Sequence, residues 1–552
     1  MNTQSLPLQE IISRIVAPKR DFEKRLGLRL ADRSPFWSGL GTMPRLNQRW
    51  ARQPTLDFIN YSLRGVGQVV FLNNPLSGLL ILLALFIQSP WIGLMSLVAV
   101  VSSTVTAIAL KIDRDTIRSG TYGYNGILIG TALATFGLSG NGGWNWWWGI
   151  AVIILSALTT VMMNSLGVWW VTTFSCPSLT LPFNIITLLF LGLVRLIPQS
   201  VFELGTATDT TSVASIDITR LLASLPISFG QIFLADKLIV GCLILLAVAI
   251  CTPVSAVVGL VGAALGVLAG LMLGIVPEDI YQGLWGYNSV LSAMAIGGVF
   301  YAPNLRSFLI GSVCAFVTAL IIPLGTAILT TPFGLPVLTL PFCVATIGCF
   351  IILRRYLPYL VPVPVVLHPV TSPKEHRQRY LAAKKTLSNF RRQLKAAMDN
   401  KSDRLLIDRA SNATKEDLHY TFEAIDTDRS GELSTQELAS YLHQAGRGIS
   451  EDELIYLFNC MDRDNSGTIN FEEFGELILR HQRLIPEHDA FMTYFSPIYA
   501  SKNNLLGIKE MNIGMKSVSE PSLIREEIDF LQQRTNNRSF TWNQFVELLL
   551  LT

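Results

Sequence analysis

Two twelve-residue segments near the C-terminus place oxygen-bearing side chains at regular intervals. Each has an aspartate first, a glycine at the sixth position and a glutamate at the twelfth, and they begin 36 residues apart, at 426 and 462. A hard divalent cation takes six to eight oxygen ligands, and this spacing wraps oxygens around one point. The segments therefore predict two cation sites with these ligand positions: Asp426, Asp428, Ser430, Glu432, Ser434 and Glu437, then Asp462, Asp464, Ser466, Thr468, Asn470 and Glu473.

This pattern resembles the EF-hand loop, in which the glycine permits a sharp bend and the last glutamate binds calcium through both oxygens. Neither loop lacks a ligand position, which favours two bound calcium ions over two decayed structural loops. Residues 483–552 look like a second pair without ions, because Arg538 stands where the glycine belongs and Gln544 where the glutamate belongs. We expect that region to be structural.

Uncharged polar residues recur in the apolar N-terminal part of the chain. Gly-Tyr-Asn occurs twice and is followed each time by Leu-Thr-Leu-Pro-Phe, while Gln68 and Gln231 lie 163 residues apart and Thr180 and Thr339 lie 159 apart. Three matched pairs in the same order indicate a duplicated unit. Buried amides and hydroxyls at matched positions can offer hydrogen-bond acceptors to a neutral polar solute.

Composition places this duplicated part in a membrane. Half of the 552 residues are hydrophobic and only 15% are charged, and no charged residue occurs between Arg118 and Arg195 or between Arg306 and Arg354. About 20 apolar residues cross a bilayer, so such gaps accommodate two or more crossings. Basic residues after Arg354 place the C-terminal side in the cytoplasm, and an even number of crossings places the N-terminus there too. A bacterial inner membrane or a plasma membrane is compatible with this pattern.

The fold expected is all-α. It is a polytopic membrane protein with two inverted repeats of about five transmembrane helices plus a half-crossing helix each, followed by a soluble EF-hand domain. The proposed boundaries are an N-terminal cytoplasmic tail 1–54, membrane repeats 55–206 and 207–360, a Pro-containing and basic linker 361–410, paired calcium-binding EF-hands 411–482, and a degenerate EF-hand-like pair 483–552.

Residues 60–360 resemble the urea transporter family in their paired Gly-Tyr-Asn and Leu-Thr-Leu-Pro-Phe elements, their repeat period and the Gln-x-x-Phe that precedes Asn73-Asn74-Pro75. The resemblance implies ten transmembrane helices and two half-crossing helices, one narrow pore in each subunit of a homotrimer, and passive, channel-like passage of urea. It also implies the residues of the pore: Gln68 and Gln231 near the two mouths, Thr180 and Thr339 at the centre, and walls from Phe71, Tyr124, Leu128, Phe233, Tyr287 and Leu291.

The second half departs from the first after Gln231, because its aromatic residue, Phe233, comes one position early. Either Phe233 or Leu234 could therefore face the pore. Other residues also have a second interpretation: the glutamines could cap helices, the threonines could bond to their own helices, and the wall aromatics could be core residues. Proline after each threonine favours pore lining, because proline removes a backbone donor.

Residues 374–404 form a predicted basic amphipathic helix, with Leu387, Phe390 and Leu394 at helical spacing. EF-hand pairs that bind calcium expose a groove suited to such helices, so contact between the calcium-binding pair and this helix would link calcium to the channel. The helix could instead lie on anionic lipid. Expected partners are thus urea, the lipid bilayer and further copies of the chain, and not nucleic acid.

Two alternatives to a urea channel stay open: a channel for another small neutral amide, and a calcium sensor whose membrane half is an anchor or scaffold. The internal duplication and the buried polar pairs weigh against a mere anchor. An enzyme is not expected, because none of the six histidines precedes position 368 and no nucleophile and base have catalytic spacing in the membrane half.

Overall fold

The computed structural model divides the chain into two compact units, one within residues 34–378 and one whose described residues lie within 379–552. Each unit is described separately. The described residues are 41–43, 46, 49–138, 146–174, 176–196, 203–204, 216–356, 360, 373–398, 406–444, 454–455, 458, 462, 466–479, 505–517, 520–535 and 539–541.

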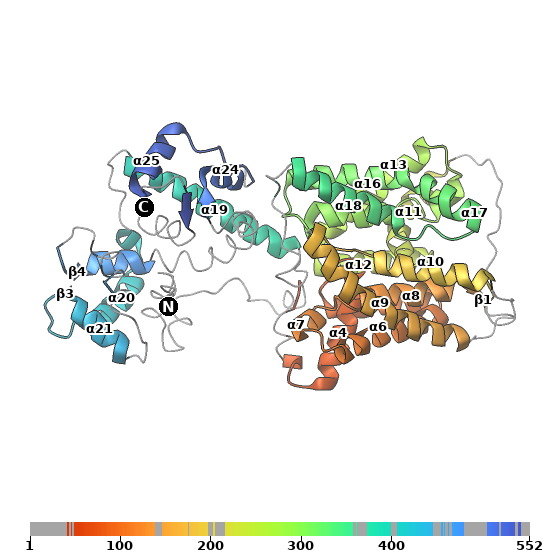
Figure 1. Ribbon diagram of the computed structural model, residues 1–552, viewed down its shortest axis with the longest axis horizontal. Coiled ribbons are helices and arrows are strands. Elements are labelled where there is room, and N and C mark those ends of the chain that lie inside the picture. Colours follow the sequence, from red (N-terminus) through yellow and green to blue (C-terminus); the bar gives the residue numbers. More distant parts are fainter. Residues whose placement is uncertain are drawn as a thin grey trace. The chain divides into compact units, whose positions relative to one another are not determined.

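The first unit is a bundle of apolar helices that run roughly along one direction (Figure 1). The elements of its first half are α4 (Pro54–Gln68), α5 (Pro75–Gln88), α6 (Pro90–Ala109), α7 (Arg114–Arg118), α8 (Tyr124–Phe136), β1 (Gly137–Leu138), α9 (Trp146–Phe174), α10 (Leu181–Leu196) and β2 (Glu203–Leu204). The short strands β1 and β2 pair antiparallel, with Gly137 opposite Leu204.

The second half repeats this order of helices. Its elements are α11 (Ile218–Gln231), α12 (Leu238–Cys251), α13 (Pro253–Met272), α14 (Pro277–Tyr281), α15 (Tyr287–Met294), a π-helical turn (Ala295–Val299), α16 (Leu305–Gly325), a second π-helical turn (Thr326–Thr330), α17 (Thr331–Phe333) and α18 (Leu340–Tyr356).

Proline and capping residues explain where several of these helices begin. Proline opens α4, α5, α6, α13 and α14, and its fixed φ and missing N–H suit the first turn of a helix. Asn74 caps α5, with its side-chain oxygen accepting from the Leu76 and Ser77 amides at 2.8 and 3.1 Å. Helix α4 therefore ends at Gln68, and a new helix, α5, begins at Pro75.

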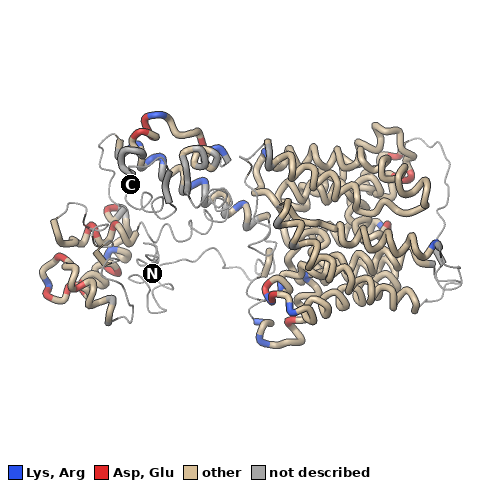
Figure 2. The backbone as a smooth tube through the Cα atoms, in the orientation of Figure 1, with Lys and Arg blue, Asp and Glu red and all other residues tan. Residues whose placement is uncertain are grey.

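Length and composition make four described helices able to cross a membrane: Pro90–Ala109, Trp146–Val171, Pro253–Met272 and Leu305–Phe333. Five shorter apolar helices accompany them: Pro75–Gln88, Tyr124–Phe136, Leu181–Arg195, Leu238–Cys251 and Leu340–Leu353. Figure 2 shows the charged residues of this unit mostly near helix ends, with long uncharged stretches between. Such an arrangement suits helices whose ends meet water and whose middles meet hydrocarbon.

Backbone conformation repeats between the two halves. Left-handed residues follow α4 and α11 at Phe71 (φ 60°) and Leu234 (φ 58°), and they precede α10 and α18 at Leu179 and Leu338 (both φ 51°). Such a conformation costs a non-glycine residue roughly 1–2 kcal/mol. Its recurrence 163 and 159 residues apart shows that the duplication seen in the sequence extends to local structure.

The second unit includes α19 (Pro373–Met398) from residue 379 onward. The elements that follow are a 3₁₀ turn (Leu406–Arg409), α20 (Asn412–Ile425), β3 (Glu432–Leu433), α21 (Thr435–Gln444) and β4 (Ile469–Asn470). Strands β3 and β4 pair antiparallel, with Leu433 opposite Ile469. Phe422 packs edge-on against Phe471 and Phe474, with ring centroids 5.6 Å apart in both pairs. The pairing joins the two predicted cation loops back to back.

The last elements are β5 (Leu505–Gly507), α24 (Ile508–Ser517), α25 (Arg525–Thr535) and β6 (Ser539–Thr541). Strands β5 and β6 pair antiparallel, as β3 and β4 do. We call these four elements the C-terminal lobe.

Candidate functional site

The two Leu-Thr-Leu-Pro-Phe motifs meet inside the first unit. The hydroxyl oxygens of Thr180 and Thr339 lie 2.7 Å apart, and both residues are buried. Each threonine directly precedes a helix or its first turn, α10 and α18 respectively, after a left-handed leucine. Two residues 159 positions apart in sequence thus form one polar centre in an apolar bundle.

Asn184 completes this centre, and the sequence reasoning missed it. Its side-chain nitrogen lies 2.8 Å from both the Thr339 hydroxyl and the Thr180 carbonyl, and its oxygen accepts from the Thr339 amide at 3.1 Å. Cys343, the equivalent residue of the second half, lies 3.2 Å from the Thr180 hydroxyl. The sequence could have identified this pair, because Asn184 and Cys343 each directly follow a Leu-Thr-Leu-Pro-Phe motif.

Tyr124 and Tyr287 open helices α8 and α15 and contact the same two motifs. The Tyr124 hydroxyl donates to the Leu179 carbonyl at 2.8 Å, and the Tyr287 hydroxyl donates to the Leu338 carbonyl at 2.5 Å. Both hydroxyls are therefore engaged in holding the strained turn before the central threonine, while each ring stays partly buried beside the core.

Gln68 and Gln231 are the last residues of α4 and α11. Their side-chain nitrogens donate to backbone carbonyls, Gln68 to Ser119 at 2.7 Å and Gln231 to Gln282 at 2.9 Å. Only the NH₂ group of an amide can donate to a carbonyl, so this contact fixes which way each amide faces. Within the described structure the two side-chain oxygens accept no hydrogen bond, which leaves them available to a solute.

The wall residues differ between the two halves. Phe71 is partly buried and makes edge contacts with Phe300 (ring centroids 5.6 Å apart) and Phe342 (6.3 Å). Leu234, and not Phe233, has the left-handed backbone of Phe71 and lies at the same distance from its glutamine, whereas Phe233 is fully buried in the core. Leu128 and Leu291 are buried in the same core.

Arg64 is a buried charge that the sequence reasoning also missed. It lies one turn before Gln68 and is fully enclosed. Its Nε donates to the Asn60 side chain at 3.0 Å, and its Nη1 donates to the Asn73 carbonyl and side-chain oxygen, both at 2.5 Å. Neutral oxygens of Asn60 and Asn73 thus accept hydrogen bonds from a buried guanidinium one helical turn from Gln68.

The first predicted cation loop brings three carboxylates together, those of Asp426, Asp428 and Glu437, with ligand oxygens within 4.8 Å of one another. Gly431 is left-handed (φ 82°), and its amide donates to Asp426 at 2.9 Å, as the sharp bend requires. The Ser434 hydroxyl donates to Glu437 at 2.7 Å. The donor set of clustered carboxylates fits a hard cation such as calcium.

Electrostatics keep the last ligand ionised. Burial alone would raise the pKa of Glu437, but hydrogen bonds from the Ser434 amide and hydroxyl and from two further backbone amides outweigh it and lower the pKa to about 2. A carboxylate with so low a pKa is charged throughout the neutral range, which suits it to bind a cation.

The second loop is built alike where it is described. Gly467 (φ 83°) and Ser466 donate through their amides to Asp462, both at 2.9 Å, and the Asn470 amide donates to Glu473 at 3.1 Å. Asp464 lies outside the described residues. Two further predicted ligands link the loops, because the Thr468 hydroxyl donates to the Glu432 carboxylate at 2.7 Å. The Ser430 hydroxyl donates to the Glu432 carbonyl at 2.8 Å.

The basic helix α19 has a partner in the C-terminal lobe. Arg391 forms an ion pair with the fully enclosed Glu527 at 3.1 Å and donates to the Pro521 carbonyl at 2.6 Å, while Ser388 donates to Glu520 at 2.6 Å. The partners Glu520, Pro521 and Glu527 belong to the predicted ion-free region 483–552. Leu387 is buried, and the side chain of Phe390 lies outside the described set. Contact of this helix with the calcium-binding pair stays a prediction.

Comparison with known proteins agrees with these two units. A urea transporter family model matches residues 59–354, and a model of an EF-hand domain pair matches residues 415–479. The chain is 33% identical to urea transporter 1 of Ovis aries over 373 residues, which covers 66% of this chain and 92% of that protein. It is 36% identical to urea transporter 1 of Rattus norvegicus over 334 residues, covering 60% and 85%.

The matched region contains both halves of the duplicated bundle and all ten predicted pore residues. Urea transporters move a solute and catalyse no reaction, which confirms the expectation that the chain is not an enzyme. The second match confirms the EF-hand pair and with it the expectation of calcium binding. The chain belongs to the urea transporter family, as a membrane protein that carries a C-terminal EF-hand pair.

Proposed function

We propose that the first unit is a passive channel for urea, with a filter made by Gln68, Gln231, Thr180 and Thr339. The observation that carries this proposal is the fixed orientation of the two glutamines, whose amide nitrogens are tied to backbone carbonyls while their oxygens stay available. Urea has four N–H donors and one carbonyl, so a row of neutral acceptors matches its edge. The matching names of the relatives support urea as the solute.

Selection against ions follows from the same residues. The central hydroxyls are neutral and buried, so a permeating ion would lose its hydration without gaining a compensating charge. The walls of the slot are proposed to be Phe71, Leu128, Leu291 and Leu234, with the rings of Tyr124 and Tyr287; of the two candidates after Gln231, the geometry favours Leu234 over Phe233. A planar solute that is neutral passes between such walls, and a hydrated ion does not.

The two halves are proposed to be inverted repeats that cross the bilayer in opposite directions, five helices and a half-crossing helix each, in a homotrimer at the cell membrane with both termini cytoplasmic. Two calcium ions are proposed for the EF-hand pair. Because the linker helix α19 is held by the C-terminal lobe, calcium would reach the channel through the arrangement of this whole second unit and not through the linker alone.

The test is urea efflux from proteoliposomes that contain the full chain, followed by stopped-flow light scattering. Gln68→Leu and Gln231→Leu should each lower urea flux severalfold, since each removes one acceptor. Gln88→Leu is the matched control, because Gln88 bonds Asp236 at the exposed end of α5. Equal flux in all three variants would refute the filter. Rapid flux of acetamide with little flux of urea would favour a channel for another amide.

A further inference from the structure

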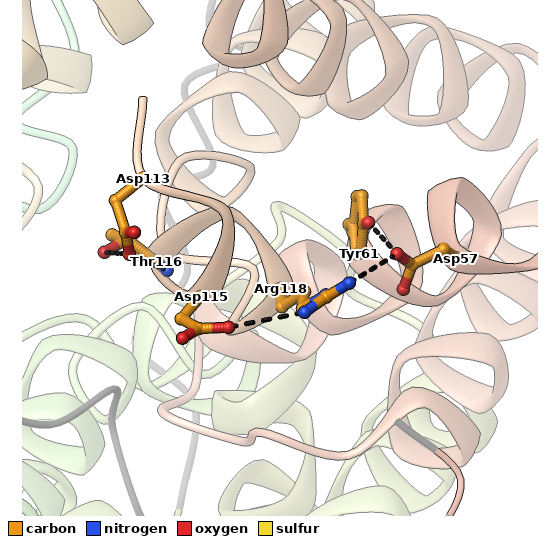
Figure 3. A network of polar contacts seen from close by, with 6 residues as sticks. All are labelled: Asp57, Tyr61, Asp113, Asp115, Thr116 and Arg118. Carbon is orange, nitrogen blue, oxygen red and sulfur yellow. Dashed lines mark hydrogen bonds and ion pairs between the residues drawn. The ribbon is translucent and has the colours of Figure 1, made fainter. Parts of the chain in front are cut away.

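A set of polar side chains connects the start of α4 with the end of α7. Arg118 Nη2 lies 3.3 Å from Asp57 Oδ2, the Tyr61 hydroxyl donates to the same Asp57 oxygen, and Arg118 Nη1 lies 3.4 Å from Asp115 (Figure 3). Asp57 is buried and Arg118 is a quarter exposed, whereas Asp115 is mostly exposed. We call Asp57, Tyr61 and Arg118 the first bridge, and Asp115 is an exposed side contact of the same guanidinium.

The second half has a bridge at the same positions, with the arginine on the long-helix side, in α11, instead of at the end of the short helix. Arg220 lies 163 residues after Asp57, and Tyr281 lies 163 after Arg118. Arg220 contacts both oxygens of Glu278, at 2.7 and 2.8 Å, and its guanidinium carbon lies 4.4 Å from the centre of the Tyr281 ring. We call Arg220, Glu278 and Tyr281 the second bridge.

In both halves the bridge ends one residue before the carbonyl that orients the filter glutamine. Ser119, which accepts from Gln68, directly follows Arg118. Gln282, which accepts from Gln231, directly follows Tyr281. A bridge that holds the end of the short helix therefore also holds the carbonyl to which the glutamine is tied.

A close backbone contact holds the other side of that carbonyl in the first half. Gly120 follows Ser119 with a left-handed backbone (φ 77°), and a Cβ placed on it would lie 2.4 Å from the Gly65 nitrogen. The chain beyond Ser119 is thus fixed against the middle of α4, and the chain before it is fixed against the start of α4 by the first bridge. Loss of the bridge removes the side-chain tie between the end of α7 and the start of α4, which leaves the Ser119 carbonyl less firmly placed.

We infer that Asp57 and Arg118, and by the same geometry Arg220 and Tyr281, are positioning residues of the filter: each bridge fixes the carbonyl that aims its glutamine oxygen at the solute. The inference rests on the proposed filter role of the glutamines. The first bridge has the larger effect, because Asp57 is buried, while Arg220 is half exposed and its pair with Glu278 is weakened by solvent.

The experiment compares Asp57→Asn with Asp115→Asn in the full chain, reconstituted in proteoliposomes. Asp115 contacts the same guanidinium but is 80% exposed, so its loss should leave urea flux unchanged. Asp57→Asn should raise the urea concentration for half-maximal flux severalfold and change maximal flux less, because the acceptor is misdirected and the pore stays open. Equal half-saturation in both variants would overturn the inference.

A rescue variant distinguishes the loss of glutamine positioning from general damage to the fold. Installing the second bridge in the first half, by Asp57→Arg with Asp115→Glu and Arg118→Tyr, should restore half-saturation towards that of the unmodified chain. If Asp57→Asn fails to fold, Tyr61→Phe serves in its place, since it removes one hydrogen bond to Asp57 and keeps the ion pair. Failure of the transplanted bridge in a folded protein, with no shift for Tyr61→Phe, would contradict the inference.

Gln68→Leu, measured beside these variants, distinguishes a failure of the bridge from a failure of the filter. An effect of Gln68→Leu without one of Asp57→Asn overturns the bridge and leaves the filter standing. No effect of either overturns the filter itself. An effect of Asp57→Asn that persists undiminished in the Gln68→Leu background shows that Asp57 does not act through the glutamine.

Discussion

Replacing Thr180 with valine removes one hydroxyl of the central pair and keeps the branched shape of the side chain. The loss of a neutral hydrogen bond costs about 1 kcal/mol, and an unsatisfied buried partner raises this to about 3. The Thr339 oxygen still accepts from the Asn184 nitrogen at 2.8 Å, so this hydroxyl keeps one hydrogen bond and the lower value is used. A passing urea also loses the Thr180 hydroxyl as a hydrogen-bond partner, and a loss of about 1–1.4 kcal/mol corresponds to a roughly five- to tenfold lower permeability.

The assay is stopped-flow urea efflux at matched protein density, with Thr180→Ser as the control that keeps the hydroxyl. Thr180→Ser should retain most of the flux. In the Thr339→Val background the further change Thr180→Val should cost less than it does alone, since the two hydroxyls bond each other. The reasoning is refuted if the valine and serine variants have the same flux, or if the two valine changes are additive.

Three further changes test other parts of the structure. Gly120→Ala should destabilise the first unit well beyond Gly274→Ala, because both pay for a left-handed backbone but only a Cβ at Gly120 would clash, 2.4 Å from a backbone nitrogen; equal melting temperatures would contradict this. Glu437→Gln should reduce calcium binding from two ions to one by isothermal titration calorimetry, and unchanged stoichiometry would show that loop one does not bind. Glu527→Ala removes the enclosed carboxylate and leaves the Arg391 guanidinium with only backbone carbonyls of Pro521 and Ser522, so it should lower the stability of the second unit by about 3–5 kcal/mol in chemical unfolding; an effect no larger than that of an exposed ion pair would contradict the buried contact.

The duplicated pattern singled out the two threonines whose hydroxyls lie 2.7 Å apart in the structure, whereas the filter role of the threonines and glutamines stays a prediction. Gln68 and Gln231, like Thr180 and Thr339, stand out because uncharged polar residues in apolar segments recur at similar spacings, 163 and 159 residues. The cation loops were equally accessible, since a loop that wraps one ion has a fixed ligand spacing. In each case the chemistry depends on residues close in sequence or repeated at one period.

The remaining parts depend on long-range packing. Asn184 and Arg64 acquire their partners only when the helices associate, so neither single segment reveals them. The choice between Phe233 and Leu234 turns on backbone handedness, which the sequence does not display. The contact of α19 with the C-terminal lobe depends on a buried ion pair between residues 136 positions apart, and a basic amphipathic helix alone does not specify its acidic partner.

The measurement that tests the central claim most directly is urea efflux from proteoliposomes carrying the full chain, beside protein-free liposomes, with ionic current recorded in parallel across a planar bilayer. The account predicts rapid, saturable urea flux without ionic current, because the filter offers neutral acceptors and no counter-charge. Repeating the efflux with calcium at micromolar level and with chelator shows whether the EF-hand pair controls it. Urea flux no faster than through lipid, in both calcium conditions, would contradict the account.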